Sequence, residues 1–521
     1  MQLAAGYQHL IDKYELHVMP MAWSARIDSR IKGRDQKDLG TDRLMVFDPS
    51  YKPGDSLVAH LQFALRYEGV NLQVLERLYE AAGGAEVAEW LEEKPSSGYA
   101  RRACFLYEWI TGDTLPIEDP VPRKTRYVPA LDLALQYGSN HGARNERFKI
   151  YNNLPGTPEF CPLVRKTDFL LSIAEKDLHT RTQNTLAKYD EDLLRRAAAF
   201  LYLKETQSSF EVEREKPSPT RAQRFADLLR EADARAPLTK ERLVELQNAV
   251  VDPRFREFDW RSRQNWVGKD LGYRQQIDFV PARPEDLPSL MNGLLDTAAR
   301  SWDMFKIQSV GKDLGFDGKA SPVHAEGDPV IAAASIAFGF VFIHPFMDGN
   351  GRIHRYLIHE VLAKGGFTPR GIVLPISAVI LANIDDYIEV LEQFSRPLRR
   401  VTDYSPDTPE IPAKGNDAIF FRFFDATEQA EFLYRALEKT VEEDLQGEID
   451  FLIGFDRACT ALNDLLDWPD HSMELFVRMA HQNGGVLSNS KRKRTFEWMT
   501  EAEVEKAQIK VREAFYGPEL P

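Results

Sequence analysis

The chain contains 521 residues, 43% of them hydrophobic and 28% charged, and carries a formal net charge of −14. This acidic balance argues against a general nucleic-acid or anionic-membrane binder, because both of those partners are negatively charged. Its three cysteines are too far apart for a zinc site or a disulfide framework. Neither a secretory signal nor an apolar run of membrane-spanning length is present, so we expect a soluble cytoplasmic protein of about three domains.

The first part of the chain shows amphipathic helical patterns at Asp55–Tyr67, Asn71–Ala82 and Tyr99–Thr111, the second and third closed by glycine. They predict an N-terminal helical module over residues 1–112. Residues 113–166 are rich in proline, glycine and asparagine, which predicts an irregular connection that wraps its neighbours. We expect aromatic side chains to fix this connection, among them Tyr127, Tyr137, Phe148 and Tyr151.

Helical patterns dominate the next part of the chain, which we expect to form a core over residues 167–404. A long helical stretch starts at Asp190 and runs to about residue 214. A second helix starts at Asp328-Pro329, where aspartate can cap the helix and proline suits its first position. Residues Val330 to Ile343 are apolar almost all round, which predicts a buried helix.

Residues 344–355, which follow this buried helix, read His-Pro-Phe-Met-Asp-Gly-Asn-Gly-Arg-Ile-His-Arg. Pro345 disfavours helical geometry in the residue before it, and Gly349 and Gly351 permit backbone conformations closed to other residues. Apolar residues then recur at helical spacing from Ile353 until two glycines stop the pattern. The glycine turn therefore lies at a helix N-terminus, where unpaired N–H groups and the helix dipole attract anions.

The charged side chains of this segment are those that phosphoryl or nucleotidyl transfer requires. Arg352 and Arg355 lie on neighbouring faces of the helix, and each guanidinium can bind phosphate oxygens through two N–H groups. Asp348 can supply an oxygen ligand to a Mg²⁺ ion shared with those phosphates. His344 remains as the candidate general base, because imidazole titrates near neutral pH.

The segment resembles the signature of the Fic family: histidine, proline, phenylalanine, any residue, aspartate or glutamate, glycine-asparagine-glycine-arginine, two residues and arginine. Every specified position matches. The resemblance implies an all-helical core that transfers AMP from ATP to a Tyr, Thr or Ser hydroxyl of a target protein, with His344 as base and Asp348 on Mg²⁺. It implies nucleotide contacts from Phe346, Gly349, Asn350, Gly351, Arg352 and Arg355.

A second resemblance concerns the end of the helical stretch at residues 190–214. Ser209 and Glu213 fit the Fic inhibitory helix, whose pattern is serine or threonine, three residues, glutamate, then glycine or asparagine. In that family the glutamate pairs with the second motif arginine, here Arg355, which implies autoinhibition. Arg214 departs from the pattern, and Glu211 competes for the same role. The alternative is a solvated acidic face at a helix end.

Two further segments near the motif resemble parts of the family. Residues 264–280, including Trp266, Val267 and Gly268, resemble the β-hairpin flap that aligns the target by strand-like pairing. The alternative is an ordinary surface hairpin. Tyr387 lies on a predicted helix where the family often has an aromatic residue near adenine, and core packing is an equal alternative for it.

The C-terminal segment, residues 416–521, is predicted to be a helical module. Met473–Ala480, a glycine turn and the basic run Lys491–Arg494 are compatible with a DNA-binding helix-turn-helix. We favour a solvated, salt-bridged face, because glutamates flank the basic run. The fold class that we predict is mainly α: a Fic-type helical core with a small β-hairpin flap, plus helical N-terminal and C-terminal modules.

The predicted function is therefore that of a protein adenylyltransferase restrained by its own inhibitory helix, with ATP as substrate and Mg²⁺ as cofactor. Its partner is a target protein of unknown identity, and self-modification and homo-oligomers are compatible with the sequence. The alternatives are removal of AMP at the same site, or a nucleotide-responsive regulatory protein with a Fic core. His354 and His359 lack the spacing of a metallohydrolase helix, so we do not assign them to a metal.

Overall fold

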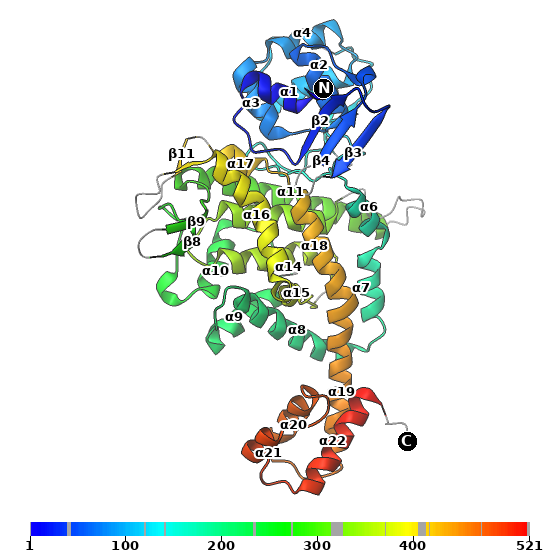
Figure 1. The fold of residues 1–521 in the computed structure, drawn as a ribbon, viewed down its shortest axis with the longest axis vertical. Coiled ribbons are helices and arrows are strands. Elements are labelled where there is room, and N and C mark those ends of the chain that lie inside the picture. The colour runs from blue at the N-terminus through cyan, green and yellow to red at the C-terminus, as the bar shows by residue number, and fades with distance from the viewer. Residues whose placement is uncertain are drawn as a thin grey trace.

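The computed structural model describes residues 2–38, 43–118, 121–139, 142–232, 236–271, 275–313, 327–369, 371–404, 413–415, 417–469 and 471–517. The protein is mainly α-helical, as predicted. An N-terminal module lies at one end of the molecule, a helical body in the middle, and a C-terminal module at the other end of a long helix (Figure 1). Within the described ranges, no helix is long and apolar enough to cross a membrane.

The N-terminal module combines helices with a four-stranded sheet of order β1-β2-β4-β3, in which β2 and β4 are parallel. Three of its helices were predicted from the sequence and the sheet was not. Strand β3 shows why, because its sequence Arg-Asp-Gln-Lys-Asp has no apolar alternation. The elements are β1 (Gln2–Ala5), α1 (Tyr7–Tyr14), β2 (Trp23–Asp28), β3 (Arg34–Asp38), β4 (Arg43–Phe47), η1 (Pro49–Tyr51), α2 (Leu57–Tyr67), α3 (Leu72–Ala82), α4 (Ala85–Glu93) and α5 (Gly98–Thr111).

In the described part of the connection after α5, the regular elements are the short strands β5 (Val128–Pro129), β6 (Ala143–Asn145) and β7 (Ile150–Asn152). Phe148 and Tyr137 are buried, so aromatic side chains do fix this segment. Its last part runs through the helical body, where the buried ring of Phe160 packs on the backbone of Gly339. A Cβ atom at Gly339 would overlap that ring, which explains why glycine stands there.

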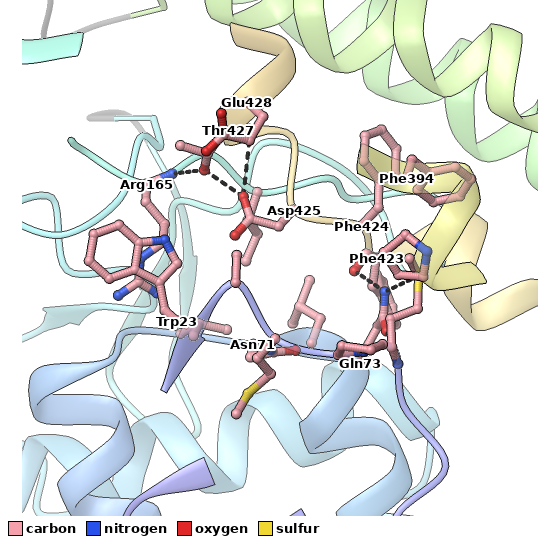
Figure 2. Close-up of a pocket in the computed structure, with 18 of the residues that line it drawn as sticks. Trp23, Asn71, Gln73, Arg165, Phe394, Phe423, Phe424, Asp425, Thr427 and Glu428 are labelled. Atoms are coloured by element: carbon pink, nitrogen blue, oxygen red, sulfur yellow. Dashed lines mark hydrogen bonds between the residues drawn. The ribbon is translucent and has the colours of Figure 1, made fainter. Parts of the chain in front are cut away.

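A cavity of about 140 Å³ lies where the N-terminal module meets the helical body (Figure 2). The Gln73 side chain donates from the N-terminal module to the Phe423 carbonyl at 2.9 Å. On the other side, the Arg165 guanidinium stacks on Trp23, 4.6 Å from the ring centroid. These contacts join the two parts at a distance from residues 344–355, which do not line the cavity.

The helical body carries the motif. Its helices before the motif are α6 (Asp168–Glu175), α7 (Leu178–Leu186), α8 (Glu191–Val212), α9 (Pro219–Arg230), α10 (Lys240–Val250), η2 (Pro253–Phe255), η3 (Pro284–Asp286), α11 (Leu287–Asp313), α12 (Pro329–Ala333), η5 (Ala334–Phe338) and α13 (Gly339–Ile343). The helices that begin within the motif or after it are α14 (Asn350–Lys364), α15 (Ile376–Ala382), α16 (Ile384–Val401), α17 (Ala418–Arg422) and α18 (Thr427–Lys439). Its strands are β8 (Val267–Asp270), β9 (Gln275–Phe279), β10 (Asp403–Tyr404) and β11 (Ala413–Lys414).

The predicted buried helix before the motif is present as α12, η5 and α13 in succession. Asp328 caps it, accepting from the Val330 N–H at 2.8 Å, as its sequence indicated. The middle segment, η5, has π geometry, which occurs often near functional sites. Residues on all sides of this helix are buried, so it forms the centre of the body and delivers its last residue to a fixed position.

Helix α18 continues through η6 (Thr440–Asp444) into α19 (Leu445–Asn463), which carries the C-terminal module (Figure 1). This module adds α20 (Ser472–His481), α21 (Asn489–Thr495) and α22 (Glu501–Tyr516) around a separate small core that includes Phe476 and Phe496. The basic run lies in α21, where Arg492 pairs with Glu501 at 3.1 Å. That pairing is of the kind expected for a solvated face.

Candidate active site

The motif forms a sharp turn between α13 and α14. His344 ends α13 in the left-handed region, with φ of 57° and ψ of 59°, which is unusual for a residue with a side chain. Gly349 precedes α14 with φ of 92°, a conformation that favours glycine. The turn therefore stores backbone strain at His344, and its surroundings must hold it in place.

Asparagine side chains hold the turn from within. Asn350 donates to the Phe346 carbonyl at 2.7 Å and accepts from the Phe346 N–H at 3.1 Å. Asn265, at the base of the hairpin, donates to the same carbonyl at 3.1 Å. The amide of Asn350 is thus engaged by the turn, so its backbone N–H is the group that it offers to an anion.

Arg261 braces the turn from outside and was not singled out by its sequence. It is 3% exposed, and its Nε and Nη1 donate to the carbonyls of His344 at 2.8 Å and Arg263 at 2.9 Å. Nη2 donates to the Ala282 carbonyl, and the Arg261 N–H donates to the Pro345 carbonyl at 2.9 Å. Burial lowers the pKa of Arg261 to about 10, which still leaves it charged at neutral pH.

His344 has the geometry of a general base. Its Nδ1 lies 3.1 Å from the Val341 carbonyl, which only accepts, so Nδ1 carries the proton and Nε2 bears the free lone pair. Burial and the nearby charge of Arg261 lower the pKa of His344 to about 4. The imidazole is therefore neutral at physiological pH and able to accept a proton.

The first turns of α14 carry two arginines, Arg352 and Arg355. Arg355 is 1% exposed and the side chain of Arg352 is 4% exposed, so both guanidinium groups are buried and need partners. Gly351 directly precedes Arg352, and a Cβ atom there would overlap the Glu213 carboxylate. A carboxylate thus occupies the anion site that the sequence predicted at this helix start.

Helix α8 supplies the partners of Arg355. Arg355 Nε donates to the Ser209 hydroxyl at 2.9 Å, and Nη2 donates to the Ser209 carbonyl at 2.6 Å and to Glu213 Oε1 at 2.9 Å. Burial raises the pKa of Glu213, but the charge and hydrogen bond of Arg355 outweigh burial and leave the pKa below its ordinary value. Glu211 is exposed and pairs with neither motif arginine, so Glu213 is the carboxylate that faces the motif.

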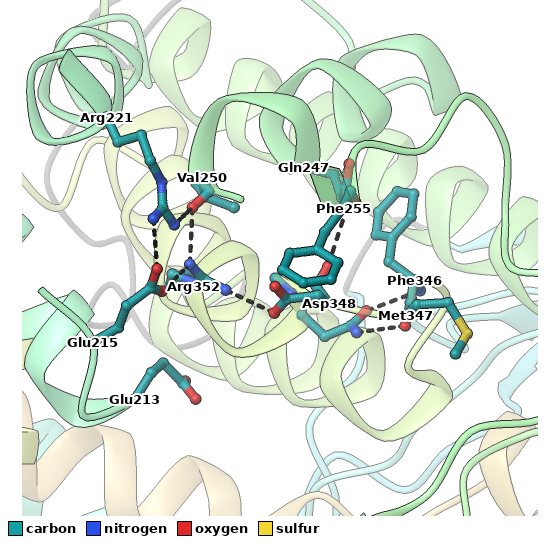
Figure 3. A network of polar contacts seen from close by, with 12 residues as sticks. Glu213, Glu215, Arg221, Gln247, Val250, Phe255, Phe346, Met347, Asp348 and Arg352 are labelled. Atoms are coloured by element: carbon teal, nitrogen blue, oxygen red, sulfur yellow. Dashed lines mark hydrogen bonds and ion pairs between the residues drawn. The ribbon is translucent and has the colours of Figure 1, made fainter. Parts of the chain in front are cut away.

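Arg352 has a separate set of partners, shown in Figure 3. Its Nη1 donates to Glu215 Oε2 at 2.5 Å and to the Val250 carbonyl at 2.8 Å. Its Nη2 donates to Asp348 Oδ1 at 2.8 Å, and this oxygen also accepts from the Gly349 N–H at 2.6 Å. Neither Glu215 nor Val250 belongs to the motif.

The segment between the two carboxylates is a strained helix end. Arg214 has φ of 56°, and its N–H donates to the Glu211 carbonyl at 2.8 Å. The Glu215 N–H donates to the Phe210 carbonyl at 3.1 Å, which completes a Schellman motif. Glycine or asparagine suits the left-handed residue of that motif, so the departure at Arg214 places an arginine where the backbone favours a small residue.

Comparison with known proteins identifies part of this body: the Fic/DOC family model matches residues 237–362. This part of the chain is a Fic/DOC-family domain. The protein adenylyltransferase Fic of Nematostella vectensis is 34% identical over 118 residues, which are 22% of this chain and 21% of that protein. A Fido domain-containing protein of Dictyostelium discoideum is 38% identical over 80 residues, 15% of this chain and 51% of that protein.

Among solved structures, a Fic family protein from Desulfovibrio desulfuricans is 16% identical, with a TM-score of 0.36 over 65% of this chain and 86% of that chain. A Fic domain-containing protein from Bacteroides thetaiotaomicron is 21% identical, with a TM-score of 0.33 over 53% of this chain and 97% of that one. The chain spans between a fifth and a half of the length of the two curated relatives above. Helix α8 lies outside the matched residues.

Two predicted nucleotide contacts of the Fic domain are packed inside the protein. Phe346 is fully buried, and its ring lies 5.3 Å from that of Trp260. It anchors the turn in the core, and its contact with a nucleotide stays a prediction. Tyr387 is also buried and stacks on His354 with centroids 6.1 Å apart, as the core-packing alternative requires.

The predicted flap is an antiparallel hairpin of β8 and β9, and residues 272–274 at its tip lie outside the described residues. Val267 is 43% exposed, and Gly268 lies at a register shift with φ of 156°, where a Cβ atom would overlap the Gln276 carbonyl. Trp266 packs beside Ile277 and Val280. At the hairpin base, the Phe279 ring lies 6.4 Å from the His344 ring, so the flap borders the candidate base.

Sequence reasoning missed Glu215, Arg221 and Arg261. Glu215 follows the matched glutamate by two residues and belongs to no repeating pattern, and Arg221 lies on another helix. The local sequence does not mark either arginine as buried, because Arg221 lies between Thr220 and Ala222 and Arg261 lies between Trp260 and Ser262, although a buried arginine needs several acceptors. Position in the sequence did not show which acceptors those would be.

Proposed function

We propose that the protein is an adenylyltransferase that transfers AMP from ATP to a Tyr, Thr or Ser hydroxyl of a target protein. The observation that carries the proposal is the arrangement at one turn: a neutral histidine with a free Nε2 beside a helix N-terminus with two buried arginines. The relatives named protein adenylyltransferase support the same reaction.

The reaction assigns a task to each group. The target hydroxyl oxygen attacks the α-phosphorus of ATP, a new P–O bond forms, and the bond to the oxygen that bridges to the β-phosphate breaks. Pyrophosphate leaves, and His344 Nε2 accepts the hydroxyl proton. The N–H groups at the start of α14, with Arg352 and Arg355, bind the phosphate oxygens and stabilise their charge. The flap would align the target segment by strand-like pairing.

The donor set also fits a Mg²⁺ ion. Proteins bind Mg²⁺ through one or two carboxylates together with phosphate oxygens and water. Asp348 presents such a carboxylate beside the anion site, with a side chain 43% exposed. When bound, the ion would neutralise charge on the phosphates. Asp348 already accepts from Arg352, which orients its carboxylate toward the phosphate site.

The end of α8 would hold this reaction in check. The carboxylate of Glu213 lies at the helix N-terminus and on Arg355, where a phosphate of ATP would bind. Phosphate and carboxylate compete for the same donors, so productive binding requires that Glu213 leave. A target protein or a second copy of the chain that withdraws the end of α8 would activate the enzyme.

Radiolabelled ATP tests the proposal. In a Glu213→Gly background, label from the α-phosphate should appear on protein, and His344→Ala should reduce it by about a hundredfold or more with little change in ATP affinity. His471→Ala replaces an exposed histidine of the C-terminal module and should leave transfer unchanged. Transfer of γ-label would indicate a kinase-like reaction. Nucleotide binding without any transfer would indicate a regulatory switch.

A further inference from the structure

The partners of Arg352 form a cluster that the proposed function does not use. Glu215 accepts from Arg352 Nη1 through one carboxylate oxygen and from Arg221 Nη1 through the other, both at 2.5 Å (Figure 3). Arg221 lies on α9 and also donates to the Val250 carbonyl, which Arg352 shares. One carboxylate therefore bridges a motif arginine and an arginine from outside the motif.

The neighbouring aromatic residue strengthens this cluster. The Phe210 ring is fully buried, with the Arg221 guanidinium 5.3 Å and the Arg352 guanidinium 5.4 Å from its centroid. Cations at such distances are attracted to a ring face. Residues 209–215 include the end of α8 and the three residues after it. This segment contacts Arg352 through Phe210 and Glu215, and it contacts Arg355 through Ser209 and Glu213.

We propose that Glu213 and Glu215 together imitate two phosphates of a nucleotide, and that Glu215 is a second inhibitory group that occupies Arg352. This inference rests on the proposed nucleotide site. Each carboxylate neutralises one motif arginine, as successive phosphates of ATP or ADP would. A polyphosphate must therefore displace both carboxylates, whereas the single phosphate of AMP needs only one anion position.

The bridge to Arg221 makes the two carboxylates separable. If Glu213 alone is removed, Glu215 stays fixed by Arg221 and continues to occupy Arg352. Loss of Glu213 should therefore activate the enzyme only in part, and the second arginine should become available only when Glu215 is also neutralised. The response should be graded, because Glu213 pairs with Arg355 and Glu215 pairs with Arg352.

Nucleotide affinity tests this inference without requiring any AMP transfer. Glu215→Gln keeps the size of the side chain but removes its charge, and it replaces one of the two accepting oxygens with an amide NH2 that cannot accept from an arginine. It should tighten ATP and ADP binding by about tenfold and AMP binding by less than about twofold. The double variant with Glu213→Gly should bind ATP more tightly than either single variant. Glu211→Gln makes the same charge change on an exposed residue and should have no effect.

Several outcomes would overturn the inference: an unchanged ATP affinity in Glu215→Gln, an equal gain for AMP, or an equal gain in Glu211→Gln. Tighter ATP binding without AMP transfer in any variant would instead reject the proposed function and retain the inference. If Glu215→Gln does not fold, hydrogen exchange of the unaltered protein decides. Saturating ATP should increase exchange over residues 209–215 and AMP should not, and equal exchange with both would reject the second carboxylate.

Discussion

The motif turn, residues 344–350, and the helix end that lies on it, residues 209–215, are held by different kinds of contact. The turn is fixed by buried groups, with Asn350 and Arg261 each less than 4% exposed and bonded to backbone atoms. The end of α8 is held by the carboxylates of Glu213 and Glu215, whose side chains are 39% and 33% exposed, and by a strained backbone at Arg214. Partly exposed ion pairs contribute less stability than buried networks.

The turn is therefore the permanent part of the site, whereas the carboxylates at the end of α8 can be replaced on the arginines by a ligand. Water and ligand oxygens can reach the carboxylates, so their place on the arginines is open to exchange. The contacts that brace the turn offer no such access, because the Asn350 and Arg261 side chains that donate to the carbonyls of Phe346 and His344 are buried. Variants at the end of α8 and variants at the turn test this difference.

The largest effect is expected from removing the carboxylate on Arg355. Glu213→Gly should raise ATP-dependent self-modification by about tenfold to a hundredfold, because Arg355 and the N–H groups of α14 then become free for phosphate. Label incorporation from α-labelled ATP measures this. Glu211→Gly is the matched control on the same helix end. Activation by Glu211→Gly in place of Glu213→Gly would show that the wrong carboxylate has been assigned.

Removing a buried contact of the turn should lower the free energy of unfolding. Arg261→Met keeps the length of the side chain but leaves the carbonyls of His344, Arg263 and Ala282 without their donor, which should cost about 3 kcal/mol. Urea unfolding measures this, and Arg263→Met, two residues away and exposed, is the control. A loss below about 1 kcal/mol would mean that the turn does not depend on this brace.

The motif turn could be predicted from the sequence better than the end of α8 that lies on it. Proline and glycine act locally, so the helix end at His344 and the helix start at Gly349 could be predicted from their immediate neighbours. Helical spacing predicted α2, α3, α5 and the buried helix before the motif in the same way. The pairing of Glu213 with Arg355 was predicted from family resemblance, and the structure has this contact together with a further one from Arg355 to Ser209.

Features that join distant residues could not be predicted where no family resemblance pointed to them. Glu215 and Arg352 are 137 positions apart, and no local pattern links them. The parallel pair β2 and β4 joins two strands that are separated in the sequence by β3. The burial of Phe346 likewise depends on Trp260, which reaches it only in the folded chain. Packing decides such features, and spacing in the sequence does not record it.

A smaller effect concerns pH. With a pKa of about 4, His344 should stay neutral down to pH 5, so kcat/KM of Glu213→Gly should hold at pH values where an ordinary histidine, with a pKa near 6.5, would be protonated. The acid limb of the profile measures this. Because the unfolded chain takes up this proton first, stability should fall as pH falls from about 6.5 toward 4. An acid limb near 6.5 would show that His344 is not held in this environment.

The smallest effect should come from Arg214, where backbone strain and side-chain charge can be separated. Glycine adopts the left-handed conformation without the penalty that a Cβ imposes, so Arg214→Gly should stabilise the fold by about 1 kcal/mol. A firmer helix end keeps Glu213 on Arg355, so basal self-modification should fall a few-fold. Arg214→Ala removes the same charge but keeps the strain, and should leave stability nearly unchanged.

Comparing the two Arg214 variants decides between the causes. If alanine and glycine lower self-modification equally, the arginine acts by drawing the Glu213 carboxylate away from Arg355, and strain is irrelevant. If only glycine lowers it, the left-handed backbone is what loosens the helix end. Arg214→Asn should then behave like glycine, since asparagine tolerates that conformation. Thermal unfolding and label incorporation, measured on all three variants, show how far the strained residue at position 214 makes it easier for phosphate to displace Glu213 from Arg355.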